Sequence, residues 1–246
     1  MREFAPGIHL VESTVRFYGV KVQTRMTVIR LSDSRLFVHS PVGLDAAIQR
    51  ALDDLGEVAF VVSPNKIHHL SIGEYIDAYP EAKTFASPGL PERRPDLAFD
   101  GVLGDQPDPA WATELDQAEI RGNIFFSEIV FLHRASRTLL VADLVENFDR
   151  GTASALGRTL ARLFGVGPKP VASPEHRLYT SDARAAAESF ERIQSWDFER
   201  IVLSHGSLIE SDGRAVMKAV GEHLLGQVSR RPKAAKKVLG ALARLQ

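Results

Sequence analysis

The stretch that most constrains the fold is EVAFVVS, residues 57–63, a nearly continuous apolar run. A half-exposed strand would alternate apolar and polar residues, so this run predicts a strand that is covered on both faces, as in a parallel sheet. Residues 44–55 precede it with apolar side chains at 44, 47, 48, 51 and 55, which is helical spacing, and Gly56 follows as a stop. A helix that leads into a buried strand predicts an α/β fold.

The rest of the chain continues this pattern without an internal repeat. Proline-rich connections are expected over 88–110 and 166–181. Strands are expected at 7–13, 20–42 (as two runs), 57–63, 83–88, 118–143 (with a hairpin turn at 134–137) and 199–205, and helices at 44–55, 71–79, 152–165, 182–197 and 214–228. We therefore expect one domain over residues 1–228, followed by a basic tail or helix over 229–246.

The basic tail, SRRPKAAKKVLGALARLQ, carries lysines and arginines but no acid. Its apolar residues have helical spacing, so it is either a basic amphipathic helix that contacts a membrane surface or a partner, or a solvated C-terminal helix whose cations suit the helix dipole. The whole chain has a net charge of −1 and no cysteine, which excludes disulfides and thiolate metal sites. With no signal-like start and no long apolar run, we expect a cytoplasmic protein without a nucleic-acid partner or an integral membrane segment.

Four apolar strands each end at a histidine or an aspartate. RLFVH ends at His39, the 57–63 strand leads to His68 and His69, TLLVAD ends at Asp143, and RIVLSH ends at His205. Ligands of α/β sheets bind at the carboxyl edge, so parallel strands would bring these side chains together. The alternative for any one histidine is a capping or hydrogen-bonding role where the chain emerges into water.

The other histidines do not share this context. His133 lies beside the expected hairpin turn, and its strand and the 138–143 strand should be antiparallel. His133 and Asp143 then lie at opposite ends of the hairpin, roughly 15 Å apart at ~3.4 Å per residue. We therefore do not expect His133 to be a metal ligand.

The segments SPNKIHHLSIGEY, EIVFLHRASRTLLVADL and IVLSHGS, with their order along the chain, resemble the metallo-β-lactamase superfamily. They are most similar to an uncharacterised branch of it that is known only as a domain of unknown function. The resemblance covers roughly residues 6–212. It implies an α/β, four-layer αββα sandwich with metals at one edge of two facing sheets.

The motif that carries the metals in hydrolytic members, Thr-His-x-His-x-Asp-His, is degenerate here. In that order its five named residues correspond to Ser63, Pro64, Lys66, His68 and His69. The next family histidine falls near Gly122 or Asn123. The bridging Asp and the last His correspond to Asp143 and His205. The family's first-strand Asp, which supports the site, falls near His39 in this sequence. The first metal position is therefore lost, because proline has no ligand atom in its side chain and a lysine repels a cation.

The second metal position keeps a complete donor set. The resemblance implies one divalent ion, Zn²⁺ or Fe²⁺ or Mn²⁺, on His68, His69, Asp143 and His205. His39 would orient one of these ligands without binding the ion itself. Four protein ligands fill all positions of a tetrahedral site. For catalysis, one of the four residues would therefore have to lie outside the coordination sphere, or the ion would need five or six ligands.

Two functions are compatible with these residues. The first is a metal-dependent hydrolase of an ester, lactone, thioester or phosphoester, in which His68 is a ligand or general base and Lys66 stabilises a substrate oxyanion or phosphate. The second is a degenerate fold member without turnover, whose proline-rich loops shape a pocket for a small ligand or an interface for a protein.

Overall fold

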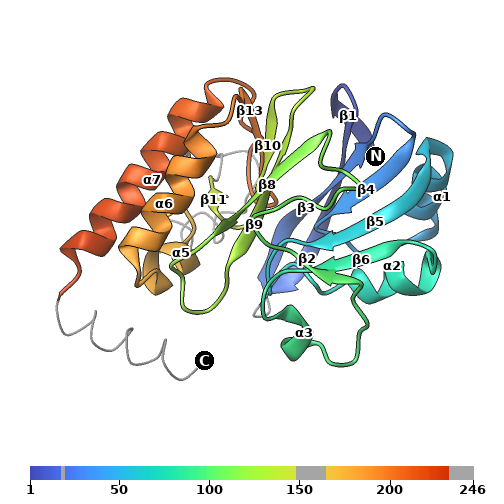
Figure 1. Cartoon of the computed structure of the whole chain (residues 1–246), viewed down its shortest axis with the longest axis horizontal. Helices are drawn as coiled ribbons and strands as arrows, with labels where there is room; N and C mark the ends of the chain where they lie inside the picture. Colours follow the sequence, from blue (N-terminus) through green and yellow to red (C-terminus); the bar gives the residue numbers. More distant parts are fainter. Residues whose placement is uncertain (18–19, 148–164, 233–246) are drawn as a thin grey trace.

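The computed structural model describes residues 1–17, 20–147 and 165–232 and shows two β-sheets packed face to face. Helices α1 (Ala46–Leu55) and α2 (Ile72–Ala78) cover the outer face of the first sheet, and α6 (Ala183–Gln194) and α7 (Gly213–Arg230) cover the outer face of the second (Figure 1). The chain therefore has the expected four-layer αββα architecture, and it forms one domain over most of its length.

The first sheet has seven strands in chain order, of which the first four are antiparallel and the last four, from β4 on, are parallel. The buried run expected from the sequence is β5, in which every residue after Glu57 is buried. The strands are β1 (Arg2–Ala5), β2 (Ile8–Phe17), β3 (Val20–Arg30), β4 (Arg35–His39), β5 (Glu57–Ser63), β6 (Lys83–Ala86) and β7 (Gly101–Val102).

The second sheet has the order β13-β10-β9-β8, with β8 (Leu115–Ile120), β9 (Glu128–His133), β10 (Thr138–Leu140) and β13 (Arg200–Val202). β9 and β10 form the expected hairpin, in which His133 faces Thr138 at the turn, and β13 runs parallel to β10. His133 therefore lies at the turn, and the chain reaches Asp143 only beyond the other end of β10. The Nδ1 atom of His133 lies 2.7 Å from Ser136 Oγ, so this histidine stabilises the hairpin turn.

Apolar cores lie between the four layers. Between the sheets, Phe37, Phe60 and Phe131 pack with Trp111, and their ring centroids lie 5.1–6.4 Å apart in the contacting pairs. Two further cores lie under the helices, one beneath α1 and α2 and one beneath α6 and α7. Full burial of large aromatic side chains contributes strongly to the stability of such a sandwich.

The proline-containing connections hold more structure than the sequence indicates. Residues 88–110 include the short helix α3 (Leu90–Arg93) and strand β7, and the 166–181 connection includes β12 (Val171–Ala172) and α5 (Pro174–Tyr179). Pro174 occupies the first position of α5, where a helix needs no N–H donor, and the Ser173 hydroxyl caps that end. Strand β12 pairs with β11 (Val145–Glu146).

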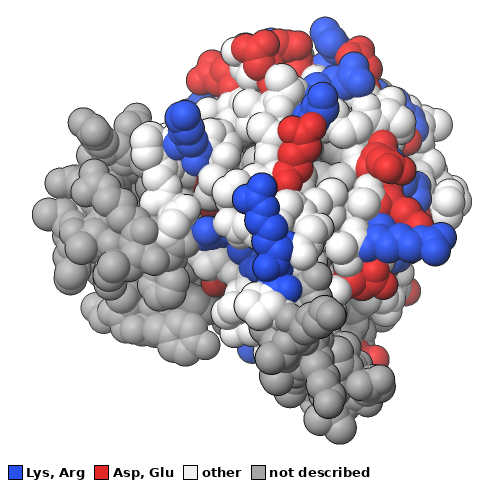
Figure 2. Space-filling model, turned by 90° about the vertical axis from the view of Figure 1, so that its left-hand side faces the viewer, with Lys and Arg blue, Asp and Glu red and all other residues white. Residues whose placement is uncertain are grey.

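Some expected elements lie outside the described residues. The helix expected at 152–165 falls almost wholly there, as does most of the basic tail, while α7 continues two residues past the expected boundary at 228. On the face that carries α7, side chains of both charge signs are spread over the surface (Figure 2). No helix in the described ranges has the length and apolar character needed to span a membrane.

Candidate metal centre

The turn that follows β5 directs the side chain of His68 towards the space between the sheets. Asn65 Oδ1 accepts hydrogen bonds from the backbone N–H groups of Ile67 and His68, at 2.9 and 3.0 Å. Ser63 Oγ donates to the His68 carbonyl at 2.7 Å, which fixes the other side of the same residue. A short polar side chain commonly organises a turn in this way, so the local sequence explains the turn.

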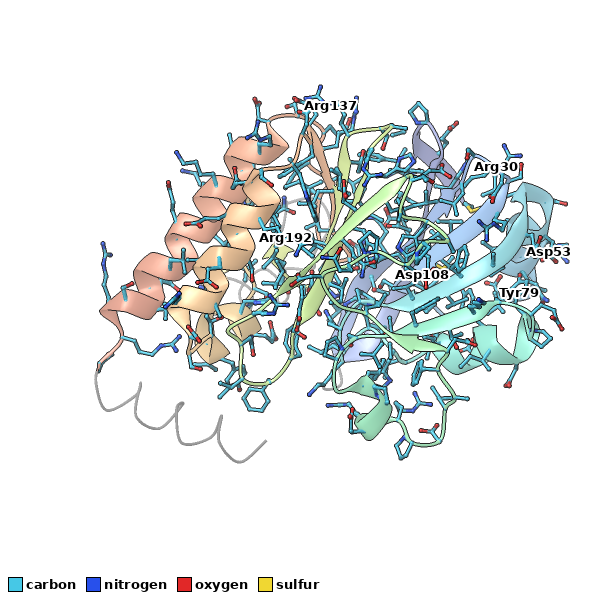
Figure 3. All side chains as sticks on the ribbon, in the orientation of Figure 1. Arg30, Asp53, Tyr79, Asp108, Arg137 and Arg192 are labelled. Carbon is cyan, nitrogen blue, oxygen red and sulfur yellow. The ribbon has the colours of Figure 1, made fainter. Side chains whose placement is uncertain are left out.

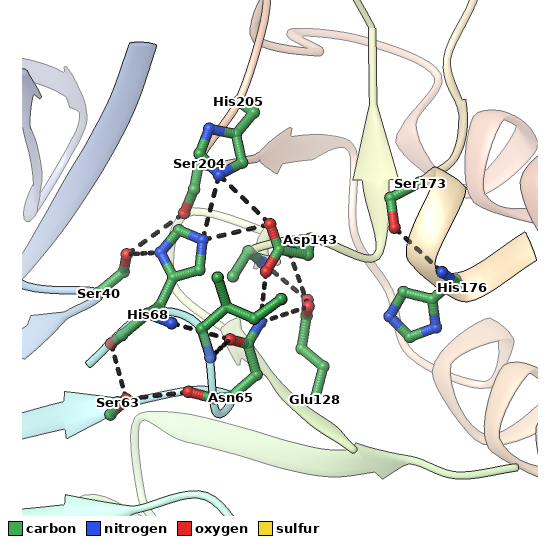
Figure 4. Close-up of polar contacts among 12 residues, drawn as sticks. Ser40, Ser63, Asn65, His68, Glu128, Asp143, Ser173, His176, Ser204 and His205 are labelled. Atoms are coloured by element: carbon green, nitrogen blue, oxygen red, sulfur yellow. Dashed lines mark hydrogen bonds and ion pairs between the residues drawn. The ribbon is translucent and has the colours of Figure 1, made fainter. Parts of the chain in front are cut away.

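Three ligand atoms from three separate strand ends meet at this point (Figure 4). His68 Nε2 lies 3.2 Å from Asp143 Oδ1 and 3.2 Å from His205 Nε2, and His205 Nε2 lies 3.3 Å from the same Asp143 oxygen. Their side chains are only 7%, 7% and 11% exposed for His68, Asp143 and His205. The site is therefore nearly closed to solvent.

The far nitrogen of each imidazole is held by another group. His205 Nδ1 lies 2.6 Å from the carbonyl oxygen of Gln23 on β3. A carbonyl can only accept, so Nδ1 carries the hydrogen and Nε2 of the neutral ring has a free lone pair. His68 Nδ1 lies 2.6 Å from Ser40 Oγ, and Ser40 follows β4 with a left-handed φ of 57°. Partners of this kind orient metal-binding histidines.

Asp143 is the fixed negative charge of the cluster. Burial alone would raise the pKa of Asp143, but the charges and hydrogen bonds of His68 and His205 hold it well below its usual range. Burial lowers the pKa of His205, yet its hydrogen bond and ion pair with Asp143 raise it to about 9 overall. In the absence of a metal ion, a proton on His205 therefore balances the buried carboxylate.

The donor set fits a single divalent cation. Two imidazole nitrogens and one carboxylate oxygen suit Zn²⁺, Fe²⁺ or Mn²⁺. Atoms that bind one such ion at ~2.0–2.2 Å lie roughly 3.0–3.5 Å from one another, which is the spacing of these three atoms. The residues brought together by the fold can therefore hold one ion with three protein ligands.

His69, the fourth ligand expected from the sequence, lies outside this group. Its Nδ1 contacts Arg94 Nη1 at 3.1 Å, and burial together with the nearby arginines lowers the pKa of His69. Consecutive side chains in the turn point in different directions, so His68 and His69 reach different surroundings. The arrangement differs from the expected four-ligand set, and it leaves coordination positions that these three ligand atoms do not fill.

Neither His39 nor Lys66 belongs to the group of three ligand residues. His39 is 1% exposed and packs edge-on against Phe131, and among the described residues its Nε2 has no hydrogen-bond partner. The next residue, Ser40, is the one that contacts His68 Nδ1. The Lys66 side chain crosses over Gly89, where its Cε and Nζ fill the space that a Cβ would need.

Three residues of the centre were not predicted from the sequence. Asn65 links the His68 turn to Asp143, Glu128 accepts the backbone N–H of Asp143 at 2.7 Å, and Ser40 contacts His68. The sequence indicates Glu128 indirectly, because it is an acid directly before the apolar run IVFL of a strand in which every residue is buried. Burial and the charge of Asp143 raise the pKa of Glu128 above its usual range.

A cavity of about 490 Å³ lies elsewhere, near the amino end of β5. It is lined by residues of α1, α2 and their connections, including Asp53 and Tyr79, whose hydroxyl donates to Asp53 at 3.1 Å (Figure 3). The three ligand atoms lie past the carboxyl end of the same strand. This cavity is therefore not part of the candidate centre.

Comparison with known structures shows the same architecture. A metallo-β-lactamase from Hirschia baltica has a TM-score of 0.60 and 17% identity, over 94% of this chain and 97% of that one. The metallo-β-lactamase FIM-1 from Pseudomonas aeruginosa, in a mono-zinc form, has a TM-score of 0.60 and 12% identity over 94% and 96%. The Flv1 flavodiiron core from Synechocystis has a TM-score of 0.63 and 13% identity, over 91% of this chain and 60% of that longer one.

At these identities the structural neighbours show the fold alone. No curated protein matches the sequence. Residues 7–159 match one family, described as a domain of unknown function, and this match covers more than half of the chain. The protein therefore belongs to the family of the domain of unknown function DUF4336, within the metallo-β-lactamase fold.

Proposed function

We propose that the protein binds one divalent metal ion on His68, Asp143 and His205 and hydrolyses an ester, lactone, thioester or phosphoester. The observation that carries this proposal is the meeting of three ligand atoms, 3.2–3.3 Å apart, from strand ends that are distant in the sequence. The partners of the two imidazoles support it, because they leave each Nε2 turned towards the same point.

A divalent ion bound here supplies Lewis-acid chemistry, which polarises a carbonyl or phosphoryl oxygen and makes water more acidic. Asp143 provides the negative charge that attracts the cation, and Gln23 and Ser40 keep the two rings in place. His68 acts as a ligand in this proposal rather than as a general base, because both of its ring nitrogens already face partners. The Lys66 side chain lies over Gly89, so stabilisation of a substrate oxyanion or phosphate by Lys66 would require this side chain to turn from Gly89 towards the ion.

Zinc, iron and manganese all suit this donor set. The neighbouring fold members include a mono-zinc metallo-β-lactamase and a flavodiiron core, so the fold accommodates one-ion occupancy and also iron proteins. A single ion is supported by the loss of the first metal position of the metallo-β-lactamase superfamily, because Pro64 and Lys66 replace two of its histidines.

The second candidate function is binding of a small ligand or a protein without turnover. The observation that favours it is the low exposure of the three ligand side chains, 7–11%. A centre so enclosed gives a substrate little direct access. In this case the metal, or the proton on His205, would stabilise the folded protein.

Elemental analysis of untagged protein, purified without chelator or added metal, tests the proposal first. We expect about one equivalent of zinc, iron or manganese, and no equivalent in the matched variant His205→Ala. Chromogenic esters, lactones, thioesters and phosphodiesters are then screened with both proteins. Hydrolysis by the wild type alone supports the hydrolase, and metal without hydrolysis supports the binding function. A wild type that takes up no metal on titration contradicts the metal centre itself.

A further inference from the structure

We infer that Asn65 and Glu128 form a positioning pair that holds Asp143 as a one-oxygen ligand and links it to the backbone of His68. The inference rests on the proposed metal centre and concerns how the protein sets the number of open positions on the ion. Neither residue touches the point where the ligand atoms meet, so both act through Asp143 and His68.

Asn65 is fully buried and uses its whole hydrogen-bonding capacity. Its Oδ1 accepts from the N–H groups of Ile67 and His68, and its Nδ2 donates to Asp143 Oδ2 at 2.8 Å and to Glu128 Oε2 at 3.1 Å. A flipped amide would face two N–H donors with its own NH₂ group and two carboxylates with its oxygen. Only one orientation of Asn65 is therefore compatible with its neighbours.

Glu128, on the adjacent strand β9, is also fully buried and holds the residues that follow β10. Its Oε1 accepts from the Ala142 N–H at 2.7 Å, and its Oε2 accepts from the Asp143 N–H at 2.7 Å and from Asn65. Both oxygens thus accept from a backbone donor. A glutamine here would place its NH₂ group against one of these N–H groups in either orientation, although it has the same size.

The pair determines which oxygen of Asp143 is available. Asn65 occupies Oδ2, so only Oδ1 faces the two imidazoles. A carboxylate held in this way contributes one ligand atom, and the ion keeps positions for water or substrate. The same amide also holds the His68 N–H, so one side chain sets the relative position of two ligands that lie 75 residues apart in the sequence.

The chemistry of the pair also fits a cation site. Two buried carboxylates, Glu128 and Asp143, share the Asn65 amide between them. Buried carboxylates are costly unless they are paired or coordinate a metal, and apolar side chains would fill the same space at lower cost. A divalent cation beside Asp143 compensates this concentration of negative charge.

The test uses the full chain, stripped of metal, and titrates Co²⁺ against a competing chromophoric chelator. The variants are Asn65→Ala and Glu128→Gln. The control is Gln117→Ala, because Gln117 is a buried amide that bridges Trp111 and the Gly104 carbonyl away from the centre. Three quantities are measured: the Co²⁺ dissociation constant, the intensity of the Co²⁺ ligand-field bands and the melting temperature of the metal-free protein.

We expect both variants to bind Co²⁺ about 10–100-fold more weakly than wild type. Their ligand-field bands should weaken, because a released Asp143 can offer both oxygens and so raise the coordination number. Gln117→Ala should lower the melting temperature but keep the wild-type affinity and spectrum. If Asn65→Ala does not fold, Glu128→Gln decides, since it preserves side-chain volume.

Wild-type affinity and an unchanged spectrum in both variants overturn the inference and leave the proposed metal centre standing. The same holds if the affinity falls no more than in Gln117→Ala at an equal loss of melting temperature, which would indicate a structural role only. A wild type that binds neither Co²⁺ nor Zn²⁺ instead defeats the proposed function, and the inference with it.

Discussion

His68 and His69 are neighbours in the chain, but their imidazoles lie in different chemical surroundings. His68 reaches Asp143 and His205, whereas His69 packs against Arg94, whose positive charge repels a metal ion. The two residues also differ in their backbone contacts, because Asn65 and Ser63 hold the backbone N–H and carbonyl of His68. The adjacent histidines are therefore expected to contribute differently to metal binding.

Single alanine variants test this difference. His68→Ala and His205→Ala should each weaken metal binding by more than about 100-fold, beyond the range for residues that only orient ligands. His69→Ala should retain about one equivalent of metal, as should the hairpin control His133→Ala. Metal content is measured by elemental analysis after dialysis. Loss of metal in His69→Ala, with a normal melting curve, would show that His69 is a metal ligand.

Gly206, directly after His205, has a left-handed φ of 98° and lies against Asn147. A Cβ at this position would overlap the Asn147 carbonyl oxygen, so Gly206→Ala should lower the free energy of unfolding by more than about 3 kcal/mol. At Gly104 a Cβ meets nothing within 4 Å, so Gly104→Ala should stay within about 1 kcal/mol of wild type. Urea unfolding compares the two, and equal stabilities would contradict the close approach at Gly206.

At the scale of elements, β3 holds the loop that carries His205. Arg25 on β3 is buried, pairs with Glu12 on β2, and donates to the carbonyls of Leu203 and Gly206 on either side of the histidine. The Gln23 carbonyl, two residues earlier on the same strand, accepts from the His205 ring. A strand of the first sheet therefore positions a ligand that belongs to the second sheet.

Replacing Arg25 should disturb both stability and metal binding. Arg25→Ala leaves two carbonyls without their charged donor, so the free energy of unfolding should fall by about 2–4 kcal/mol. The metal affinity should fall by about 10-fold because the His205 loop is no longer held. The control Arg184→Ala removes an exposed i,i+4 ion pair on α6 and should cost less than about 0.5 kcal/mol. Unchanged metal affinity in Arg25→Ala would show that the Gln23 contact alone positions His205.

At the scale of the whole molecule, two histidines outside the ligand set, one on β4 and one on α5, are buried as neutral side chains. Burial, with the charge of His68 adding to it, lowers the pKa of His39 to about 3. Burial lowers the pKa of His176 on α5 to about 4, against the opposing charge of Asp143. Both rings pack against aromatic side chains, Phe131 and Phe126 respectively.

These shifts predict loss of stability in acid. Above the unfolded-state pKa of ~6.5, each ring is neutral in both states and the contribution to stability is fully present. Below it, the unfolded chain binds protons that the folded protein excludes, so stability falls as the pH approaches the folded-state values. For His176 the loss should total roughly 3 kcal/mol by pH 4.

Urea unfolding at several pH values between 7.5 and 4 measures this loss. Because other groups titrate in the same range, the test is the difference between wild type and His176→Gln, whose side chain does not titrate. As the pH falls, the free energy of unfolding of the wild type should decrease more than that of His176→Gln. Parallel curves over the whole range would mean that His176 is not buried as a neutral ring.

The amino-acid sequence determined the layers of this protein, since the apolar run of β5, the helical spacing before it and the hairpin at 134–137 depend on local periodicity. Strand ends also predicted His68, Asp143 and His205, because the carboxyl ends of buried strands meet at one edge. Only the tertiary structure decided that His69 turns to Arg94, that Ser40 rather than His39 contacts His68, and that Asn65 and Glu128 lie behind Asp143. Those choices depend on side-chain direction and on partners 25 to 78 residues away, and a one-dimensional pattern contains neither.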